Sequence, residues 1–247
     1  MSLDVCVNPD FRHIKEGIVN IYQNYDVKGH VIFKGRNELR VVEIDGIRLV
    51  IKYFKRITWA NRIIYRFFRK SKACRSYQNA FELLRRGVAT PQPVAYIDEY
   101  KGCVLKRSFF LSEYVEHENL DFSASILEDR KLVIELAGFI HFLHQRGIFH
   151  RDLNIGNILY KQVENKYDFH LIDNNRLRFD RPTEKKMIEN LKRLFMPFET
   201  YASFVYAYAE VAEINAYSLM EKLLWVRKKK VTAWRIKTSL KKAFLTP

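Results

Sequence analysis

The chain has 247 residues, of which 48% are hydrophobic and 14% aromatic, so it can bury the core of one large domain or of two lobes. Its 43 basic and 28 acidic residues give a formal net charge of +15, which indicates a polyanionic partner: nucleic acid, an anionic membrane surface or a phosphorylated substrate. The apolar runs are too short to span a bilayer, the first residues do not read as a secretory signal, and the three cysteines lack the spacing of a zinc knuckle or a disulfide framework. We therefore expect a cytoplasmic protein with inert thiols.

The first half of the chain predicts an antiparallel sheet with a helical insertion. Residues 30–55 form three short runs rich in Val and Ile, separated by turn signals at 34–37 and at Asp45-Gly46. From Trp59 to Arg86 the apolar residues fall at helical spacing, and Gly87 is a plausible stop. A second pair of strands follows, with its turn near residues 101–102. The sequence thus predicts five strands before residue 114.

The second half changes character. Residues 129–146 repeat apolar side chains at helical spacing and end at Gly147, which indicates a buried helix. A short strand pair follows, and from Thr183 onward the pattern is mostly helical. Together the halves indicate an α+β protein in which a β-rich lobe precedes an α-rich lobe.

The stretch HRDLNIGNILY, residues 150–160, places an acid and two amides among apolar residues. It fits the pattern H-R-D-L-x-x-x-N of the kinase catalytic loop at every fixed position. In that pattern the carboxylate of Asp152 accepts the proton of an attacking hydroxyl, and the amide of Asn157 reaches a magnesium ion on the nucleotide phosphates. A second magnesium ligand is expected at the end of a following strand, where LID supplies Asp173.

The nucleotide site also needs a lysine, and Lys52 is the candidate. In residues 47–54 the odd positions are apolar, so Lys52 lies on the other face of the strand, where an ammonium group needs an anionic partner. The local pattern VIK corresponds to the strand pattern V-A-I-K, whose lysine binds nucleotide phosphates. We also assign Glu113 and Val115, at the end of the second strand pair, to nucleotide binding.

The sequence resembles the protein-kinase-like superfamily, and more closely the lipopolysaccharide core kinases of the Kdo and WaaP type. The closer resemblance rests on SKACRSYQNAFELLRRGVATPQPVAY, FLHQRGIFHRDLNIGNIL and LIDNNRLRF, where Asp173 and Arg176 match an I-D-x-x-R form. It implies a two-lobed fold, with an N-terminal lobe over residues 1–113 that carries a basic insertion at about 55–75, and a helical lobe over residues 114–247. It also implies that, with ATP and Mg²⁺, the γ-phosphate passes to a sugar hydroxyl, of Kdo or heptose, in the lipopolysaccharide inner core at the cytoplasmic face of the inner membrane.

The sequence departs from the kinase patterns in three places. It has no G-x-G-x-x-G near Gly35, no D-F-G at Asp173, and no A-P-E in the 74 residues that follow. The lysine of the nucleotide site usually pairs with a glutamate on a helix, but the alignment puts Ser76 near that position. Glu82, the acid of that helix, lies off the same face, so the acidic partner of Lys52 stays open.

The excess positive charge lies in two segments, residues 53–75 and 226–247, each with eight basic residues and no acid. Within the first, Arg62, Arg66 and Arg69 form a stripe beside aromatic residues, which fits docking on anionic lipid headgroups. Nucleic acid fits the same composition. The alternatives are therefore an atypical protein or small-molecule kinase of the same fold, and a non-catalytic module that binds nucleic acid or membrane.

Three histidines, His141, His144 and His150, offer a weaker metal hypothesis because no further ligand completes their set. We expect His150 to brace the catalytic loop instead. Arg151 is expected to have a structural role or to bind a substrate phosphate.

Overall fold

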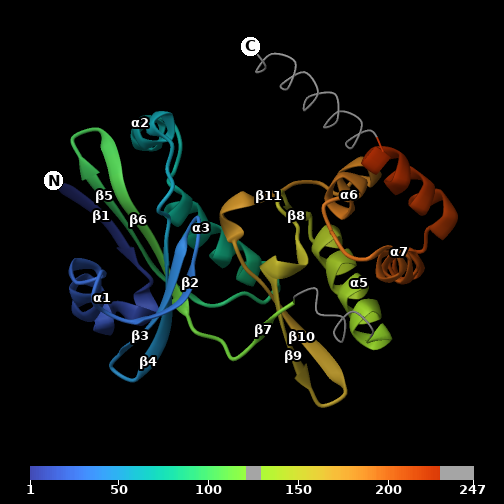
Figure 1. Cartoon of the computed structure of the whole chain (residues 1–247), viewed down its shortest axis with the longest axis horizontal. Coiled ribbons are helices and arrows are strands. Elements are labelled where there is room, and N and C mark those ends of the chain that lie inside the picture. The colour runs from blue at the N-terminus through green and yellow to red at the C-terminus, as the bar shows by residue number, and fades with distance from the viewer. Residues whose placement is uncertain (121–128, 229–247) are drawn as a thin grey trace, which may run out of the picture. The chain divides into compact units, whose positions relative to one another are not determined.

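A computed structural model describes residues 1–120 and 129–228, without the side chains of Ala60 and Ile63. The chain divides into two compact units, which are described separately (Figure 1). The first comprises Met1–Glu118 and His170–Leu177, and the second comprises Asn119–Phe169 and Arg178–Pro247. The first unit is rich in strands and the second in helices, so the predicted α+β class is confirmed.

The first unit is built on a six-stranded sheet with the order β1-β5-β6-β4-β3-β2. The strands are β1 (Ser2–Val7), β2 (His30–Lys34), β3 (Glu38–Ile44), β4 (Ile47–Tyr53), β5 (Pro93–Lys101) and β6 (Val104–Glu113). Five of them match the predicted strands, and the three predicted turns occur: β2 and β3 pair up to Lys34 and Glu38, and φ is positive at Asp45, Gly46 and Gly102 in the other two. The sequence analysis did not predict β1, which pairs along its whole length with β5.

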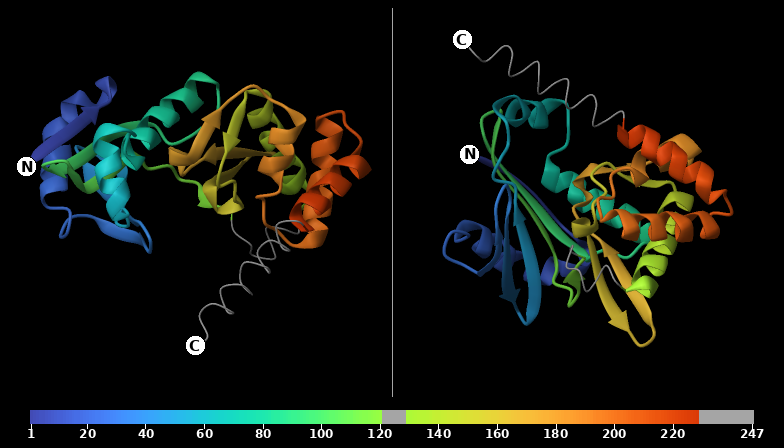
Figure 2. Two further views of the ribbon diagram at one scale, coloured as in Figure 1. Left: turned by 90° about the horizontal axis from the view of Figure 1, so that it is seen from above. Right: turned by 45° about the vertical axis from the view of Figure 1, so that its right-hand side comes forward.

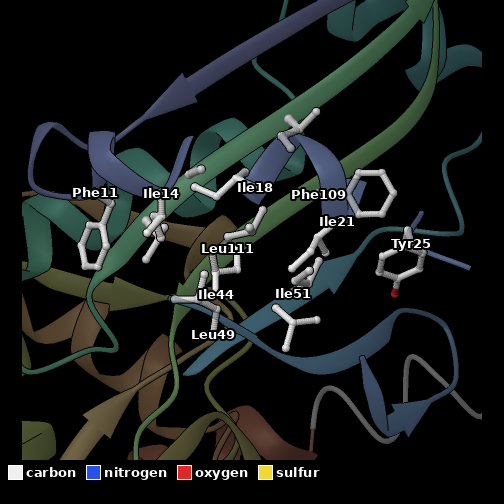
Figure 3. Close-up of a cluster of buried hydrophobic side chains, with 14 residues drawn as sticks. Phe11, Ile14, Ile18, Ile21, Tyr25, Ile44, Leu49, Ile51, Phe109 and Leu111 are labelled. Atoms are coloured by element: carbon white, nitrogen blue, oxygen red, sulfur yellow. The ribbon is translucent and has the colours of Figure 1, made fainter. Parts of the chain in front are cut away.

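One face of this sheet carries the main core of the first unit. The 3₁₀ helix η1 (Pro9–Ile14) and the helix α1 (Lys15–Gln23) turn a row of isoleucines onto Leu49 and Ile51 of β4, as Figure 3 shows. Both of these β4 residues are at most 2% exposed. Because side chains alternate along a strand, Lys52 lies on the opposite face.

The opposite face is covered by α3 (Lys72–Arg85), which packs on β5 and β6. Tyr77 of this helix meets Tyr96 of β5 edge to face, with ring centroids 5.5 Å apart. Tyr96 pairs with Phe110 of β6, and Phe110 pairs with Lys52 of β4, so all three occupy one row on this face. The register therefore places Lys52 on the face of the sheet that α3 covers.

The helical stretch predicted from Trp59 to Arg86 is not continuous. It forms α2 (Trp59–Phe67) and α3, and the two are separated by residues 68–71. Ser71 starts the second helix, because its Oγ accepts a hydrogen bond of 3.0 Å from the main-chain nitrogen of Cys74. Gly87 has φ +72 and ends α3 as predicted.

The second unit centres on α5 (Arg130–Gln145), which Asp129 caps and after which Gly147 adopts φ +67. Short strands and further helices surround it, and the β9–β10 hairpin can be followed in Figure 2. The elements are β7 (Glu118–Asn119), β8 (Ile148–His150), η2 (Ile155–Asn157), β9 (Ile158–Val163), β10 (Lys166–Leu171), η3 (Asn174–Arg176), β11 (Leu177–Phe179), α6 (Glu184–Leu191) and α7 (Phe198–Val211). Of these, η3 and parts of β7, β10 and β11 belong to the first unit.

A further helix covers residues 216–228. The remainder of the basic segment 226–247, including Lys229, Lys230 and Trp234, lies outside the described residues. Among the described helices none has the length and apolar character needed to cross a bilayer.

Candidate active site

Lys52 and Asp173, which are 121 positions apart in the chain, form an ion pair within the first unit. The Nζ atom of Lys52 lies 2.5 Å from Oδ1 of Asp173, and the two side chains are 17% and 22% exposed. Lys52 reaches this position from β4, and Asp173 follows β10. Lys52, on the face of β4 opposite Leu49 and Ile51, thus has the anionic partner that the sequence requires.

Asp173 has a left-handed backbone conformation, with φ 58 and ψ 43. Few residues other than glycine adopt this region, although Asp and Asn tolerate it, and such conformations gather at functional sites. The amide of Asn175 donates a second hydrogen bond of 2.6 Å to Oδ1 of Asp173. The carboxylate is therefore held by two donors.

The segment that carries Asp173 is anchored on α3 and on the loop before β5. Asn79 of α3 donates to the carbonyl oxygen of Asn174 at 2.6 Å. Thr90 donates from Oγ1 to the carbonyl oxygen of Leu171 at 2.7 Å and accepts from the amide of Asn174 at 2.9 Å. The bond to Thr90 gives the side chain of Asn174 a partner in its buried position, as the bond to Asp173 does for Asn175.

The acidic partner that the sequence left open is not Glu82. Its carboxylate is held by Arg85 and Arg86, with nitrogen–oxygen distances of 2.7 and 2.6 Å. Ser76 is buried, and its hydroxyl donates to the carbonyl oxygen of Lys72 in its own helix. The carboxylate that pairs with Lys52 in the described structure is that of Asp173.

The loop with Asp152 and Asn157 lies in the second unit, between β8 and β9. The side-chain amide nitrogen of Asn157 donates to the carbonyl oxygen of Asp152 at 2.8 Å, so this bond does not engage its Oδ1 atom. The main-chain nitrogen of Asp152 donates to Nδ1 of His150 at 3.1 Å, so His150 braces the loop as predicted. Leu153 and Ile155 are buried, whereas the carboxylate residue Asp152 is exposed, which accounts for the mixed composition of the stretch.

A chain of buried hydrogen bonds also supports this loop. Asn190 donates from Nδ2 to the carbonyl oxygen of His150 at 2.7 Å, so its Oδ1 must accept from Nε2 of His144 at 3.0 Å. Nδ1 of His144 then accepts from the hydroxyl of Tyr208 at 2.7 Å. Burial lowers the pKa of His144 to about 4, so the ring is neutral and this direction of donation is fixed.

Sequence reasoning did not identify Asn190 or Tyr208. The signal that the sequence offered for these two residues was a polar side chain on each of two helices, at a position that faces a buried stretch of the chain. Since both ring nitrogens of His144 are engaged, this residue cannot ligate a metal, and the three-histidine hypothesis is not supported.

The other two assigned residues, Glu113 and Val115, lie at the end of β6 and just beyond it, and both are partly buried. The main-chain nitrogen of Glu113 donates to the carbonyl oxygen of Gln92 at 2.9 Å. Glu113 also pairs in register with Leu49 of β4. Both residues therefore belong to the same unit as Lys52.

The side chains of Asn157 and Asp173 offer an amide oxygen and a carboxylate oxygen, which are hard ligands of the kind that Mg²⁺ prefers. The chemistry of these two residues is therefore suited to Mg²⁺. A strand lysine paired with a carboxylate and a loop of the form H-R-D-L-x-x-x-N are features of protein-kinase-like phosphotransferases that use an alcohol group as acceptor. Residues 35–217 match the lipopolysaccharide kinase (Kdo/WaaP) family, and the chain belongs to this family.

Relatives support the same assignment. The chain is similar to "3-deoxy-D-manno-octulosonic acid kinase" of Pasteurella multocida (strain Pm70), with 32% identity over 65% of this chain and 69% of that one. The protein of the same description from Haemophilus influenzae (strain PittGG) is 29% identical, over 67% and 73%. Among solved structures, WaaP in complex with acyl carrier protein matches 92% of this chain and 98% of that chain, with a TM-score of 0.61 at 19% identity. A microcompartment-associated aminopropanol kinase matches 89% of each chain, with a TM-score of 0.56 at 13% identity.

Proposed function

We propose that the protein transfers the γ-phosphate of ATP to a hydroxyl of Kdo in the lipopolysaccharide inner core. The observation that carries the proposal is the Lys52–Asp173 ion pair, because it brings together the candidate residues of two motifs that are distant in the sequence and that both belong to the nucleotide and metal site of kinases. The choice of Kdo over heptose is supported by the relatives described as Kdo kinases.

Each assigned residue has a role in this proposal. Asp152 accepts the proton of the sugar hydroxyl, and its exposure suits a group that must reach an acceptor. Lys52 binds nucleotide phosphates, while Glu113 and Val115, at the end of β6, bind the remainder of the nucleotide. Asn157 and Asp173 would hold Mg²⁺, which supplies charge neutralisation on the phosphates.

We further propose that α2 docks the protein on the anionic cytoplasmic face of the inner membrane. Trp59, Phe67 and Phe68 are 75%, 60% and 84% exposed. Arg62 and Arg66 lie on the same helix, and the surrounding residues 53–75 contain no acid. Aromatic side chains beside cations suit a headgroup layer better than a nucleic-acid groove, since these rings alternate with arginine on a short, strongly amphipathic helix.

The test is to incubate the purified chain with γ-labelled ATP and matched lipid-linked acceptors that end in Kdo or carry heptose. We expect label on the Kdo acceptor. Label on heptose alone would move the acceptor to the other inner-core sugar, and label only on protein would favour the atypical protein kinase.

A further inference from the structure

A cavity of about 380 Å³ lies in the first unit, where α2 and the residues that follow it meet the strands β1 and β5. The charged residues that line it fall into two sets of opposite sign. The acids are Asp4 and Asp98, and the cations are Arg66, Arg69 and Lys70. None of these residues is assigned to the candidate active site, so the cavity needs an explanation of its own.

The two acids lie directly opposite each other on neighbouring strands. Asp4 of β1 pairs in register with Asp98 of β5, and like charges in this position destabilise a sheet. Asp98 is 1% exposed, its Oδ1 atom has no hydrogen-bond partner among the described residues, and burial raises its pKa to about 6. Asp4 is exposed, with the hydroxyl of Tyr96 3.4 Å from each of its carboxylate oxygens. At neutral pH this pair of carboxylates therefore favours a positively charged group beside it.

The cations belong to another part of the cavity lining. Arg66 is on α2, Arg69 and Lys70 follow that helix, and all three are exposed. The guanidinium group of Arg66 lies 4.8 Å from the ring centroid of Tyr100, and Nζ of Lys70 donates to Oε1 of Gln78. The salt bridges between described residues include none that joins these cations to the two acids. The cavity thus holds both signs of charge without pairing them.

This arrangement suits a ligand that itself carries both charges. Arginine forks bind two oxygens of a phosphate group, and carboxylates accept hydrogen bonds from an ammonium group that has N–H donors. A quaternary ammonium group has no such donors and is bound by open aromatic faces, whereas Arg66 already covers the ring of Tyr100. The complementary ligand is therefore a phosphate ester with a primary ammonium group.

The aromatic residues of the cavity favour a membrane lipid as the source of this ligand. Phe67 and Phe68 line the same cavity, and they are 60% and 84% exposed. Exposed aromatic rings beside cations suit the boundary between headgroups and acyl chains. A headgroup held in the cavity would keep its acyl chains beside these rings, which a free phosphate ester lacks.

We propose that this cavity binds the headgroup of a phospholipid with a primary ammonium group, such as phosphatidylethanolamine. The ammonium group faces Asp4 and Asp98, and the phosphate faces Arg66 and Arg69. The inference rests on the docking role proposed for α2 and adds specificity to it. Anionic lipids attract the basic surface through charge alone, whereas this cavity selects one kind of headgroup.

The test compares cosedimentation of the wild-type chain with two kinds of vesicle. Both contain the same fraction of phosphatidylglycerol, and the remaining lipid is phosphatidylethanolamine in one and phosphatidylcholine in the other. These two headgroups share the phosphate and differ in the ammonium group. We expect about fivefold tighter binding to the phosphatidylethanolamine vesicles, the effect of one ammonium–carboxylate contact. Equal binding to both kinds of vesicle overturns the proposal.

Two variants separate headgroup recognition from general attraction to anionic lipid. Asp98→Asn and Asp4→Asn each remove a negative charge, so each should bind the phosphatidylcholine vesicles at least as tightly as wild type does. We expect both to lose the preference for phosphatidylethanolamine. The matched control is Asp45→Asn, which makes the same change at the exposed β3–β4 turn and should keep the preference. A preference that survives in both site variants overturns the proposal, because lipid packing alone then explains it.

The outcomes distinguish this site from the docking role on which it rests. Equal binding of the wild-type chain to both vesicles leaves docking intact and removes the headgroup site. Absence of binding to either vesicle contradicts docking and the site together. Thermal unfolding checks the fold of each variant. Because Asp4 is exposed, Asp4→Asn leaves the core untouched and decides the question if Asp98→Asn does not fold.

Discussion

The side-chain amide of Asn190 in α6 holds the main-chain carbonyl oxygen of His150, two residues before Asp152, at 2.7 Å. Both residues are buried, at 5% and 1% exposure. The bond links the helices of the second unit to the loop that carries the proposed base.

Replacing Asn190 should therefore disturb the position of the loop. We expect Asn190→Leu to lower kcat by one to two orders of magnitude with little change in KM for ATP, because the carbonyl oxygen of His150 loses its side-chain donor and keeps only the weaker support of the main-chain nitrogen of Leu153 at 3.1 Å. Tyr208→Phe removes only the far end of the hydrogen-bond chain and should lower kcat less. If both variants keep wild-type kcat and lose only thermal stability, Asn190 is a structural residue alone.

The carboxylate of Asp152 should be required for turnover and dispensable for nucleotide binding. Because the side chain is exposed, Asp152→Asn is expected to keep the fold and the Kd for ATP while lowering kcat by at least two orders of magnitude. Equilibrium binding and initial rates on one preparation measure both. A kcat near that of wild type in the Asn variant would remove Asp152 from the role of base.

Substitution of the proposed metal ligands should change the magnesium dependence. Asp173→Asn suits the left-handed backbone at φ 58 but loses the ion pair with Lys52, and Asn157→Ala loses an amide oxygen. We expect both variants to need more magnesium for half-maximal activity, with partial recovery at high concentration. Activity that survives chelation of divalent ions contradicts this assignment.

Asp98 of β5 should make stability depend on pH in an unusual direction. It is 1% exposed, its Oδ1 has no hydrogen-bond partner among the described residues, and burial raises its pKa from 3.8 to about 6. The folded state therefore binds the proton more tightly than the unfolded chain does. Protonation of Asp98 therefore contributes about 3 kcal/mol to the stability of the folded state. This stabilisation is complete below a pH of about 4 and is lost as the pH rises through about 6.

The matching variant is Asp98→Asn, which cannot ionise. We expect it to raise the free energy of unfolding at pH 7.5 by roughly 1–3 kcal/mol and to remove this pH dependence. Denaturant unfolding at pH 5 and pH 7.5 provides the measurement. A variant less stable than wild type at pH 7.5 would show that the carboxylate has a favourable partner.

Neutralising the arginines of the insertion should release the protein from anionic vesicles. Arg62→Gln/Arg66→Gln/Arg69→Gln removes three charges, each worth about 1 kcal/mol near such a surface, so we expect roughly 100-fold weaker cosedimentation. KM for a lipid-embedded acceptor should rise, and kcat on a soluble sugar fragment should not. A charge-matched control replaces three exposed lysines elsewhere, Lys106, Lys166 and Lys185.

Two results would contradict this membrane role. Loss of turnover on the soluble fragment would place the arginines in substrate binding. Unchanged vesicle binding with loss of nucleic-acid binding would make nucleic acid the partner.

Local patterns in the sequence predicted the strands around Lys52 and the helix α5, because alternation, helical spacing and glycine stops are encoded within short windows. They did not predict β1, whose Ser2 pairs with Tyr100 almost a hundred residues later. They also missed the break before Ser71, because the helical spacing of apolar residues continues across it. The start of α3 is instead set by the hydroxyl of Ser71, which caps the helix.

The same difference between local patterns and distant contacts applies to the candidate site. Motif spacing identified Lys52, Asp152, Asn157 and Asp173 as candidates, but it could not show that Asp173 is the acidic partner of Lys52. That pairing depends on three-dimensional proximity. The support from Asn190 likewise arises from helix packing that no short window records.

The cysteines offer a practical consequence of the β5–β6 hairpin. Cys103 is exposed at its turn, whereas Cys74 is buried and Cys6 is partly covered. Tyr100 and Leu105, which flank that turn, pack against Tyr65 of α2. A polarity-sensitive fluorophore attached to Cys103 would therefore sit beside the proposed docking helix, and its emission could time the arrival of the enzyme at a bilayer without any engineered residue.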